Sequence, residues 1–139
     1  MLILLFAAGC SNVHTQKGVD LDNKKGFATI YTDTEKNHRW ISIYDKRVYI
    51  THLDEDSLYR MGWDFSYPDI VHVALGVHRI EIEYDYMNMF SRGCLWLDAK
   101  SGEDYIVRNK AKGYTMFFWI ENLVTNRRVG GICGSEPTQ

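Results

Sequence analysis

The chain of 139 residues holds only two prolines and 11 glycines, too few for a collagen-like or low-complexity protein. Neither sign of charge is in excess, because 16 Lys and Arg residues face 18 Asp and Glu residues. The resulting net charge of −2 gives no general attraction to nucleic acid phosphates, and we expect no nucleic acid partner. No apolar run approaches the about 20 residues that a membrane-spanning helix needs.

What the chain does hold is enough apolar material for one folded domain. Apolar residues make up 45% of the sequence, and the four Trp, nine Tyr and six Phe supply bulky side chains for a core. This composition is typical of a globular protein and argues against disorder throughout the chain. The short length favours a single domain.

The N-terminus has the pattern of an export signal. An uninterrupted apolar run, Leu2 to Ala8, is followed by Gly9 and Cys10. The run is too short to cross a bilayer, but it fits the apolar core and small-residue cleavage region of a secretory signal. Ala7, Ala8 and Gly9 before Cys10 resemble the lipobox of bacterial lipoproteins, although Ala7 stands where Leu is more usual. The alternative is a buried N-terminal strand with a free thiol.

The lipobox resemblance implies that the protein is located in the cell envelope. It implies that residues 1–9 are a signal peptide, that Cys10 receives the lipid, and that the lipid anchors the protein in a membrane. Ser11 in place of Asp after the acceptor implies the outer membrane, with the protein facing the periplasm. No Lys or Arg precedes Leu2. One interpretation of that missing positive region is that translation starts upstream of Met1.

The cysteine count agrees with this location. Three cysteines leave an odd one, which lipidation of Cys10 would account for. Cys94 and Cys133 then remain for a disulfide, which the oxidising periplasm permits. The alternative is two buried thiols on neighbouring strands. No cysteine has the spacing of a zinc site or a redox motif, and we expect no metal and no cofactor.

The apolar pattern downstream has period two, which predicts strands. In Arg79–Tyr86, Ile80, Ile82, Tyr84 and Tyr86 alternate with Glu81, Glu83 and Asp85, as in a sheet with one wet face. The other predicted strands are 27–32, 39–44, 47–50, 70–75, 94–97, 105–107, 114–120 and 127–133. Turn residues recur about every ten residues, so we expect an all-β fold, a single antiparallel β-sandwich of about seven to eight short strands.

The rest of the chain falls around that domain. Residues 10–25 are polar and are predicted to be a flexible tether behind the lipidated cysteine, residues 26–133 the β-sandwich, and residues 134–139 a tail. A longer insert, 51–69, interrupts the strand pattern. Asp54–Ser57 in this insert is a candidate cap for a short helical turn at Leu58–Met61.

Three segments of the predicted sandwich resemble PEGA-like domains of small bacterial lipoproteins. Val73–Ile82 resembles their L-P-G-x-H-x-I-x-V turn, Leu97–Ile106 their A-x-x-G-x-x-Y-x-V strand pair, and Trp119–Val129 their closing W-I-x-D-x-x-T-G-x-x-V hairpin. The similarity covers roughly residues 26–130, with Leu75 in place of Pro and Asn126 in place of Gly. The resemblance implies a compact β-sandwich on an envelope lipoprotein and supplies no catalytic residues.

Sites for metals and catalysis find little support. His52, His72 and His78 with the acids at 54–56 lack zinc-site spacing, and His78 is expected to make a ring–backbone contact. Asp54–Asp56 fails the EF-hand pattern, because Tyr59 and Phe65 stand where Gly and Glu belong. The chain has no G-x-S-x-G elbow, and the alternation places Glu81 and Glu83 on an exposed face. We therefore expect no catalytic residues and no enzyme activity.

Aromatic residues offer the best candidate for a binding surface. Tyr59, Trp63, Phe65 and Tyr67, with Met61, recur at every second position in the insert. A second apolar group, Met87, Met89 and Phe90, lies in the connection after the clearest strand. These side chains either fold back as a lid on the core or form a partner-binding patch. The basic stretch Arg108–Lys112 is interpreted as a solvated turn.

The sequence thus predicts a non-enzymatic, lipid-anchored envelope protein that acts as a structural or protein-interaction module in the periplasm. The alternative is a periplasmic inhibitor or a small-ligand-binding lipoprotein. A hydrolase is the third hypothesis, and the lack of a catalytic constellation weighs against it.

Overall fold

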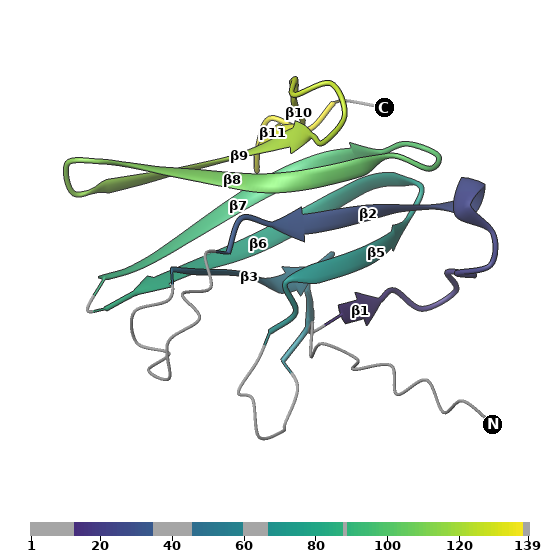
Figure 1. Cartoon of the computed structure of the whole chain (residues 1–139), viewed down its shortest axis with the longest axis horizontal. Helices are drawn as coiled ribbons and strands as arrows, with labels where there is room; N and C mark the ends of the chain where they lie inside the picture. The colour runs from purple at the N-terminus through teal and green to yellow at the C-terminus, as the bar shows by residue number, and fades with distance from the viewer. Residues whose placement is uncertain (1–12, 35–45, 60–66, 88, 138–139) are drawn as a thin grey trace, which may run out of the picture.

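The computed structural model describes residues 13–34, 46–59, 67–87 and 89–137 (Figure 1). Within these ranges the chain forms eleven strands, one 3₁₀ turn at Lys24–Gly26 and no α-helix. The strands build two sheets, and antiparallel pairs dominate both. The prediction of an all-β, sandwich-like fold is therefore confirmed, with more strands than the sequence predicted.

The first sheet has six strands in the order β1-β5-β2-β8-β9-β10. Their bounds are Val13–Thr15 for β1, Ile70–Ala74 for β5, Phe27–Thr32 for β2, Asp104–Lys112 for β8, Thr115–Asn122 for β9 and Arg128–Val129 for β10. Two of its pairings are parallel, β1 with β5 and β2 with β8. The sheet is thus mixed, which differs from the purely antiparallel sandwich expected.

The second sheet has five strands in the order β11-β7-β6-β3-β4, all antiparallel. Their bounds are Gly131–Ile132 for β11, Met89–Ala99 for β7, Gly76–Tyr86 for β6, Arg47–Leu53 for β3 and Asp56–Ser57 for β4. The predicted 127–133 strand is split between the sheets at Gly130, whose φ of 68° lies in the left-handed region that favours glycine.

The core lies between the inward faces of the two sheets. Ile80, Ile82 and Tyr84 of β6 are buried, whereas Glu81 and Glu83 are not, as the alternation predicts. The other large buried side chains come from both sheets: Ile30, Val48, Ile50, Val71, Val73, Leu95, Leu97, Tyr105, Val107 and Ile120. Burial of these side chains is the main favourable term for holding the sheets together.

Two predictions about local structure are wrong. Part of the expected tether is in the first sheet, because Val13–Thr15 pairs with β5 and the Gln16 side chain accepts a hydrogen bond from the Ala74 amide at 2.9 Å. Asp54–Ser57 does not begin a helix. Asp54 and Glu55, with φ of 50° and 73°, form the two-residue turn between β3 and β4. Asp and Asn are among the residues that tolerate this left-handed conformation, which a two-residue hairpin requires.

Candidate functional site

The outer face of the five-stranded sheet carries two of the aromatic side chains singled out from the sequence, Tyr59 and Tyr67. Tyr59, directly after β4, has about half of its surface exposed (51%). Its ring centroid lies 5.6 Å from that of Tyr67, and the Tyr67 centroid lies 6.1 Å from that of Tyr49 on β3. We call these three residues the tyrosine cluster. Trp63 and Phe65, predicted to join the surface, and Met61 lie outside the described residues.

Backbone contacts with β3 place the tyrosine cluster. The Leu58 amide donates to the Thr51 carbonyl at 2.9 Å, and the Leu58 side chain is buried in the core. The Ile50 amide donates to the carbonyl of Pro68 at 3.2 Å. The two ends of the aromatic part of the insert, residues 59–67, are therefore fixed on β3 through the neighbouring residues Leu58 and Pro68. The described part of the insert is neither a lid nor wholly displayed: Leu58 packs inward and Tyr59 outward.

Tyr49, the member of the cluster on β3, is partly buried. Its hydroxyl donates a hydrogen bond of 3.1 Å to the Asp85 carboxylate on β6. Burial, and then the negative charge of Asp85, raise the pKa of Tyr49 well above its ordinary value, so this phenol stays protonated at neutral pH. The sequence analysis did not select Tyr49. Its outward position in the β3 alternation, two residues after Arg47, was the available signal.

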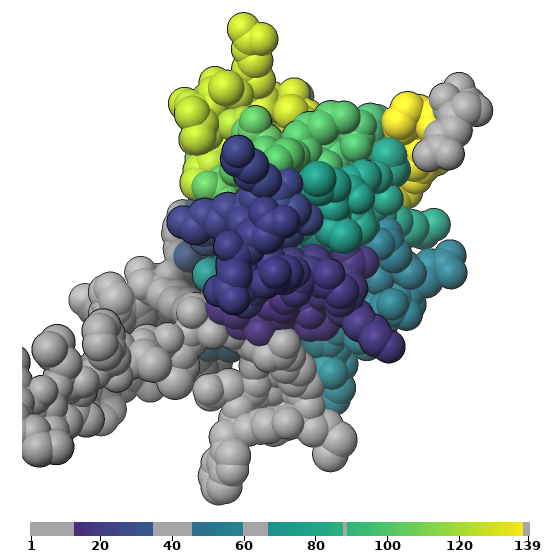
Figure 2. All heavy atoms as spheres, turned by 90° about the vertical axis from the view of Figure 1, so that its right-hand side faces the viewer, coloured from purple at the N-terminus to yellow at the C-terminus, as the bar shows by residue number. Residues whose placement is uncertain are grey.

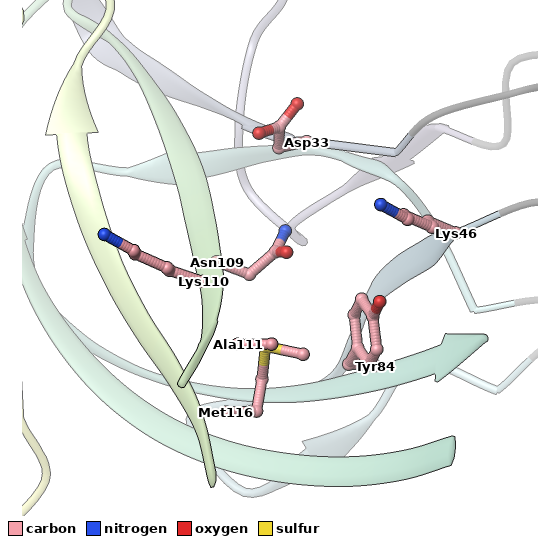
Figure 3. A pocket seen from close by; sticks show the side chains of 7 residues that line it. All are labelled: Asp33, Lys46, Tyr84, Asn109, Lys110, Ala111 and Met116. Carbon is pink, nitrogen blue, oxygen red and sulfur yellow. The ribbon is translucent and has the colours of Figure 1, made fainter. Parts of the chain in front are cut away.

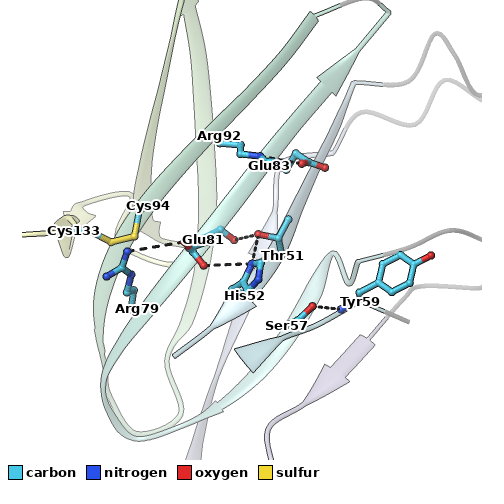
Figure 4. Close-up of polar contacts among 10 residues, drawn as sticks. All are labelled: Thr51, His52, Ser57, Tyr59, Arg79, Glu81, Glu83, Arg92, Cys94 and Cys133. Atoms are coloured by element: carbon cyan, nitrogen blue, oxygen red, sulfur yellow. Dashed lines mark hydrogen bonds and ion pairs between the residues drawn. A yellow bond between two sulfur atoms is a disulfide. The ribbon is translucent and has the colours of Figure 1, made fainter. Parts of the chain in front are cut away.

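Charged side chains lie beside the cluster on the same face (Figure 4). His52 Nδ1 is 3.3 Å from Glu81 Oε2, and Arg79 is 4.0 Å from the other oxygen of Glu81. Glu83 lies 3.5 Å from Arg92 on β7. Each glutamate thus has a cationic or histidine partner, and neither lies in the isolated apolar surroundings typical of a catalytic general acid.

A β-bulge between Ile50 and His52 arranges this corner. Ile50 and Thr51 are both buried, and the alternation resumes with His52 outside and Leu53 inside. The Thr51 hydroxyl donates to the Glu81 carbonyl at 3.3 Å, while His52 faces the Glu81 carboxylate. Bulges re-aim side chains in this way. This one turns His52 toward the row of charged side chains formed by Arg79, Glu81, Glu83 and Arg92, which we call the charged row.

The histidines considered as metal ligands do not converge. His52 contacts Glu81, His72 Nδ1 lies 3.0 Å from the Thr29 hydroxyl, and His78 contacts Asp54 and the Ala74 carbonyl. The contact with Ala74 is the ring–backbone contact expected for His78. Within the described ranges no group of three His, Cys, Asp or Glu side chains could hold a metal ion.

The disulfide predicted from the cysteine count is present. Cys94 on β7 and Cys133, directly after β11, are bonded, with their Cα atoms 5.4 Å apart. The bond lies at the edge of the sheet beside Glu81, the register partner of Cys94 (Figure 4). It fixes the C-terminal segment to β7. Cys10, the predicted lipidation site, lies outside the described residues.

The described residues also line one open hollow, of about 250 Å³, at one end of the two sheets (Figure 3). Its lining is Asp33, Lys46, Tyr84, Asn109, Lys110, Ala111 and Met116. Small-molecule pockets are usually larger and mostly apolar, whereas four of these seven side chains are charged or carry an amide. The hollow therefore gives limited support to a small-ligand-binding protein.

Comparison with family models, with curated protein sequences and with solved structures finds no match to this chain. Among the described residues no helix is both long and apolar enough to span a membrane.

Proposed function

We propose that this chain is a non-enzymatic, lipid-anchored protein of the bacterial cell envelope. In this proposal residues 1–9 are removed, Cys10 carries the lipid, and the PEGA-like β-sandwich faces the periplasm from the outer membrane. The Cys94–Cys133 disulfide supports export, because such bonds persist in oxidising compartments and are rare in the cytosol.

The sandwich acts as a protein-interaction module through the tyrosine cluster. The observation that carries this proposal is the arrangement of Tyr59, Tyr67 and Tyr49 on the outer sheet face, with Tyr59 half exposed. Tyrosine is enriched at the energetic centres of protein interfaces, since its ring buries a large area and its hydroxyl still finds a polar partner. The charged row around Glu81 supplies the polar rim that such interfaces have.

Site-specific photo-cross-linking in intact envelopes tests this function. A benzophenone side chain at position 59 is expected to capture a discrete protein adduct in cells that express the chain at native level. The matched control is position 21, where Leu21 has a similar exposed fraction (48%) outside the cluster. Equal adduct patterns at positions 59 and 21, or none at position 59, would refute the tyrosine cluster as the interface.

A further inference from the structure

One end of the sandwich is built from two hairpin tips that carry exposed apolar side chains. The β6–β7 tip displays Met87, Met89 and Phe90, exposed by 60%, 47% and 56%. The β8–β9 tip displays Tyr114, which is fully exposed, and Phe117, exposed by 49%. Both tips point to the left in Figure 1. We call this end of the molecule the hairpin end.

These side chains lie outside the core. β8 pairs with β2 only as far as Val107, and no residue from Arg108 to Trp119 is buried. The bases of the two hairpins already pack together, because the Phe118 ring lies over Gly93, where a Cβ atom would come within 2.6 Å of it. Large apolar groups that extend past the core and stay exposed mark an interaction surface.

Cations flank the β8–β9 tip. The segment 108–118 contains Arg108, Lys110 and Lys112 and no acidic residue. Arg108 is paired with Asp33 and Glu121, whereas Lys110 and Lys112 form no ion pair with any of the described residues. On the other tip, Arg92 lies over the Phe90 ring at 5.1 Å from its centroid and is paired with Glu83.

The hollow described above lies between the bases of the same hairpins. The Lys46 side chain extends into it toward Asn109, and Lys110 adds a second cation at its rim (Figure 3). Among the described residues that line it, Asp33 alone carries a carboxylate, which lies 3.4 Å from Arg108. Apolar tips with a cationic hollow and rim behind them complement the two layers of an anionic membrane surface, acyl chains beneath phosphate headgroups.

We propose that the hairpin end is a contact site for a bilayer containing anionic phospholipid. The tip side chains Met87, Met89, Phe90, Tyr114 and Phe117 enter the interface, and Lys110 and Lys112 face the headgroup phosphates. Aromatic rings favour this depth of a membrane, and Lys and Arg near an anionic surface add electrostatic attraction.

Strand directions agree with this orientation. β1 is parallel to β5, β5 is antiparallel to β2, and β2 is parallel to β8. β1 therefore runs opposite to β8, and the chain enters β1 from the side on which the β8–β9 tip lies. This part of the argument rests on the lipid anchor at Cys10 proposed above. The contact itself does not require the anchor.

Two chain lengths, from Val13 back to Cys10 and from Ile106 on to Gly113, limit how the anchored protein can be oriented on the membrane. Val13 is level with Ile106 through the register Val13–Ile70–Tyr31–Ile106, and Gly113 lies seven residues further along. Seven residues of strand span about 23 Å, whereas the three steps from Val13 back to Cys10 span at most about 11 Å. With the strands upright on the membrane, the tips would touch the bilayer while Cys10 could not reach it. The anchor and the tips reach one bilayer only if the strands are tilted away from the membrane normal.

Vesicle binding by the full-length, non-lipidated Cys10→Ser chain tests the contact separately from acylation. The chain is expected to bind phosphatidylcholine vesicles more tightly when they contain phosphatidylglycerol. At about fivefold per lysine, Lys110→Gln with Lys112→Gln should weaken binding to the anionic vesicles about 25-fold. Phe90→Ser with Tyr114→Ser should weaken it about tenfold. The apolar segment 1–9 is the same in every variant, so its contribution cancels.

Matched controls come from the other end of the molecule, where the N-terminal segment covers the surface (Figure 2). Lys24→Gln with Lys25→Gln, and Leu75→Ser with Val77→Ser in the β5–β6 turn, should leave binding unchanged. Hydrogen exchange of the full chain on anionic vesicles should slow at residues 86–92 and 110–118 and not at 20–28. Equal effects of tip and control variants, no preference for phosphatidylglycerol, or unprotected tips would each overturn the proposal.

Discussion

The Nδ1 atom of His78 lies 2.5 Å from the Oδ2 atom of Asp54, which ties the β3–β4 turn to strand β6. The other oxygen of Asp54 accepts a hydrogen bond of 2.9 Å from the Arg79 amide. His78 is buried, and its Nε2 atom lies 2.6 Å from the Ala74 carbonyl. One carboxylate therefore holds a turn, a strand and a buried ring in register.

Replacing Asp54 by Asn should destabilise the fold by about 1 to 2 kcal/mol, because the amide removes the negative charge beside the His78 ring and leaves one oxygen where the carboxylate has two. Asn tolerates the left-handed backbone at this position, so the turn itself is preserved. Urea denaturation measures the change. The control is Asp56→Asn on the exposed strand β4, and an equal effect of the two variants would contradict the role given to Asp54.

Removing the disulfide should lower the free energy of unfolding by about 4 kcal/mol, since the bond closes a loop with a sequence separation of 39. The test is denaturation of the Cys94→Ser, Cys133→Ser double variant beside wild type. Cys10→Ser, which leaves the bond intact, is the control. Mass measurement of the unreduced wild-type chain with both thiols free would contradict the bond.

Neighbouring residues at the start of the aromatic insert should respond in opposite ways. Tyr59→Ala should abolish capture of a partner while changing the free energy of unfolding by less than about 0.5 kcal/mol, because Tyr59 is half exposed. Leu58→Ala should cost about 2 to 5 kcal/mol, because Leu58 is buried in the core. Affinity purification of cross-linked envelopes and thermal denaturation read out the two effects. A large loss of stability in Tyr59→Ala would place that ring in the core.

Protonation of His72 should destabilise the folded state. Burial lowers the pKa of His72 below its ordinary value of 6.5, despite the opposing charge of Asp104. The unfolded chain therefore binds more protons than the folded chain as the pH falls through 6.5 toward the folded pKa, and stability falls over that window. Above 6.5 this contribution is constant.

The His72→Gln variant isolates this contribution, because it removes the His72 ring and leaves the other histidines in place. Urea midpoints measured from about pH 8 to about pH 5 should fall less steeply for the variant than for wild type. Identical slopes would show that His72 titrates alike in the folded and unfolded chains.

Local pattern was enough to predict much of the second sheet. In β6 the side chains of Ile80, Ile82 and Tyr84 alternate with Glu81 and Glu83, and a two-residue period in such a run has one structural solution. The cysteine count was also sufficient for the Cys94–Cys133 bond, because lipidation would leave these two cysteines as the only possible pair.

Features set by distant parts of the chain escaped prediction. β1 has three residues, and its partner Ile70–Ala74 lies more than fifty positions away, so no local period marks Val13–Thr15 as a strand. From the sequence alone Asp54–Ser57 is a candidate helix cap, because Asp and Ser serve both as helix caps and as turn residues. Only the pairing of Leu53 with Asp56 decides between them.

The hairpin end was only partly predicted. Met87, Met89 and Phe90 form the second apolar group singled out from the sequence, whereas Tyr114 falls in the predicted strand 114–120. Their exposure follows from how far each hairpin extends past the last buried position, Tyr84 on β6 and Val107 on β8. Such a length is a property of the assembled sheets and cannot be found in a single strand.

Labelling with radioactive palmitate, in cells that express wild type or Cys10→Ser, tests the central claim most directly. We expect label on the wild-type protein, which should fractionate with the outer membrane, and none on the variant. Equal labelling of the two proteins, or an unlabelled wild-type chain free in the cytosol, would contradict the lipid-anchored envelope protein proposed here.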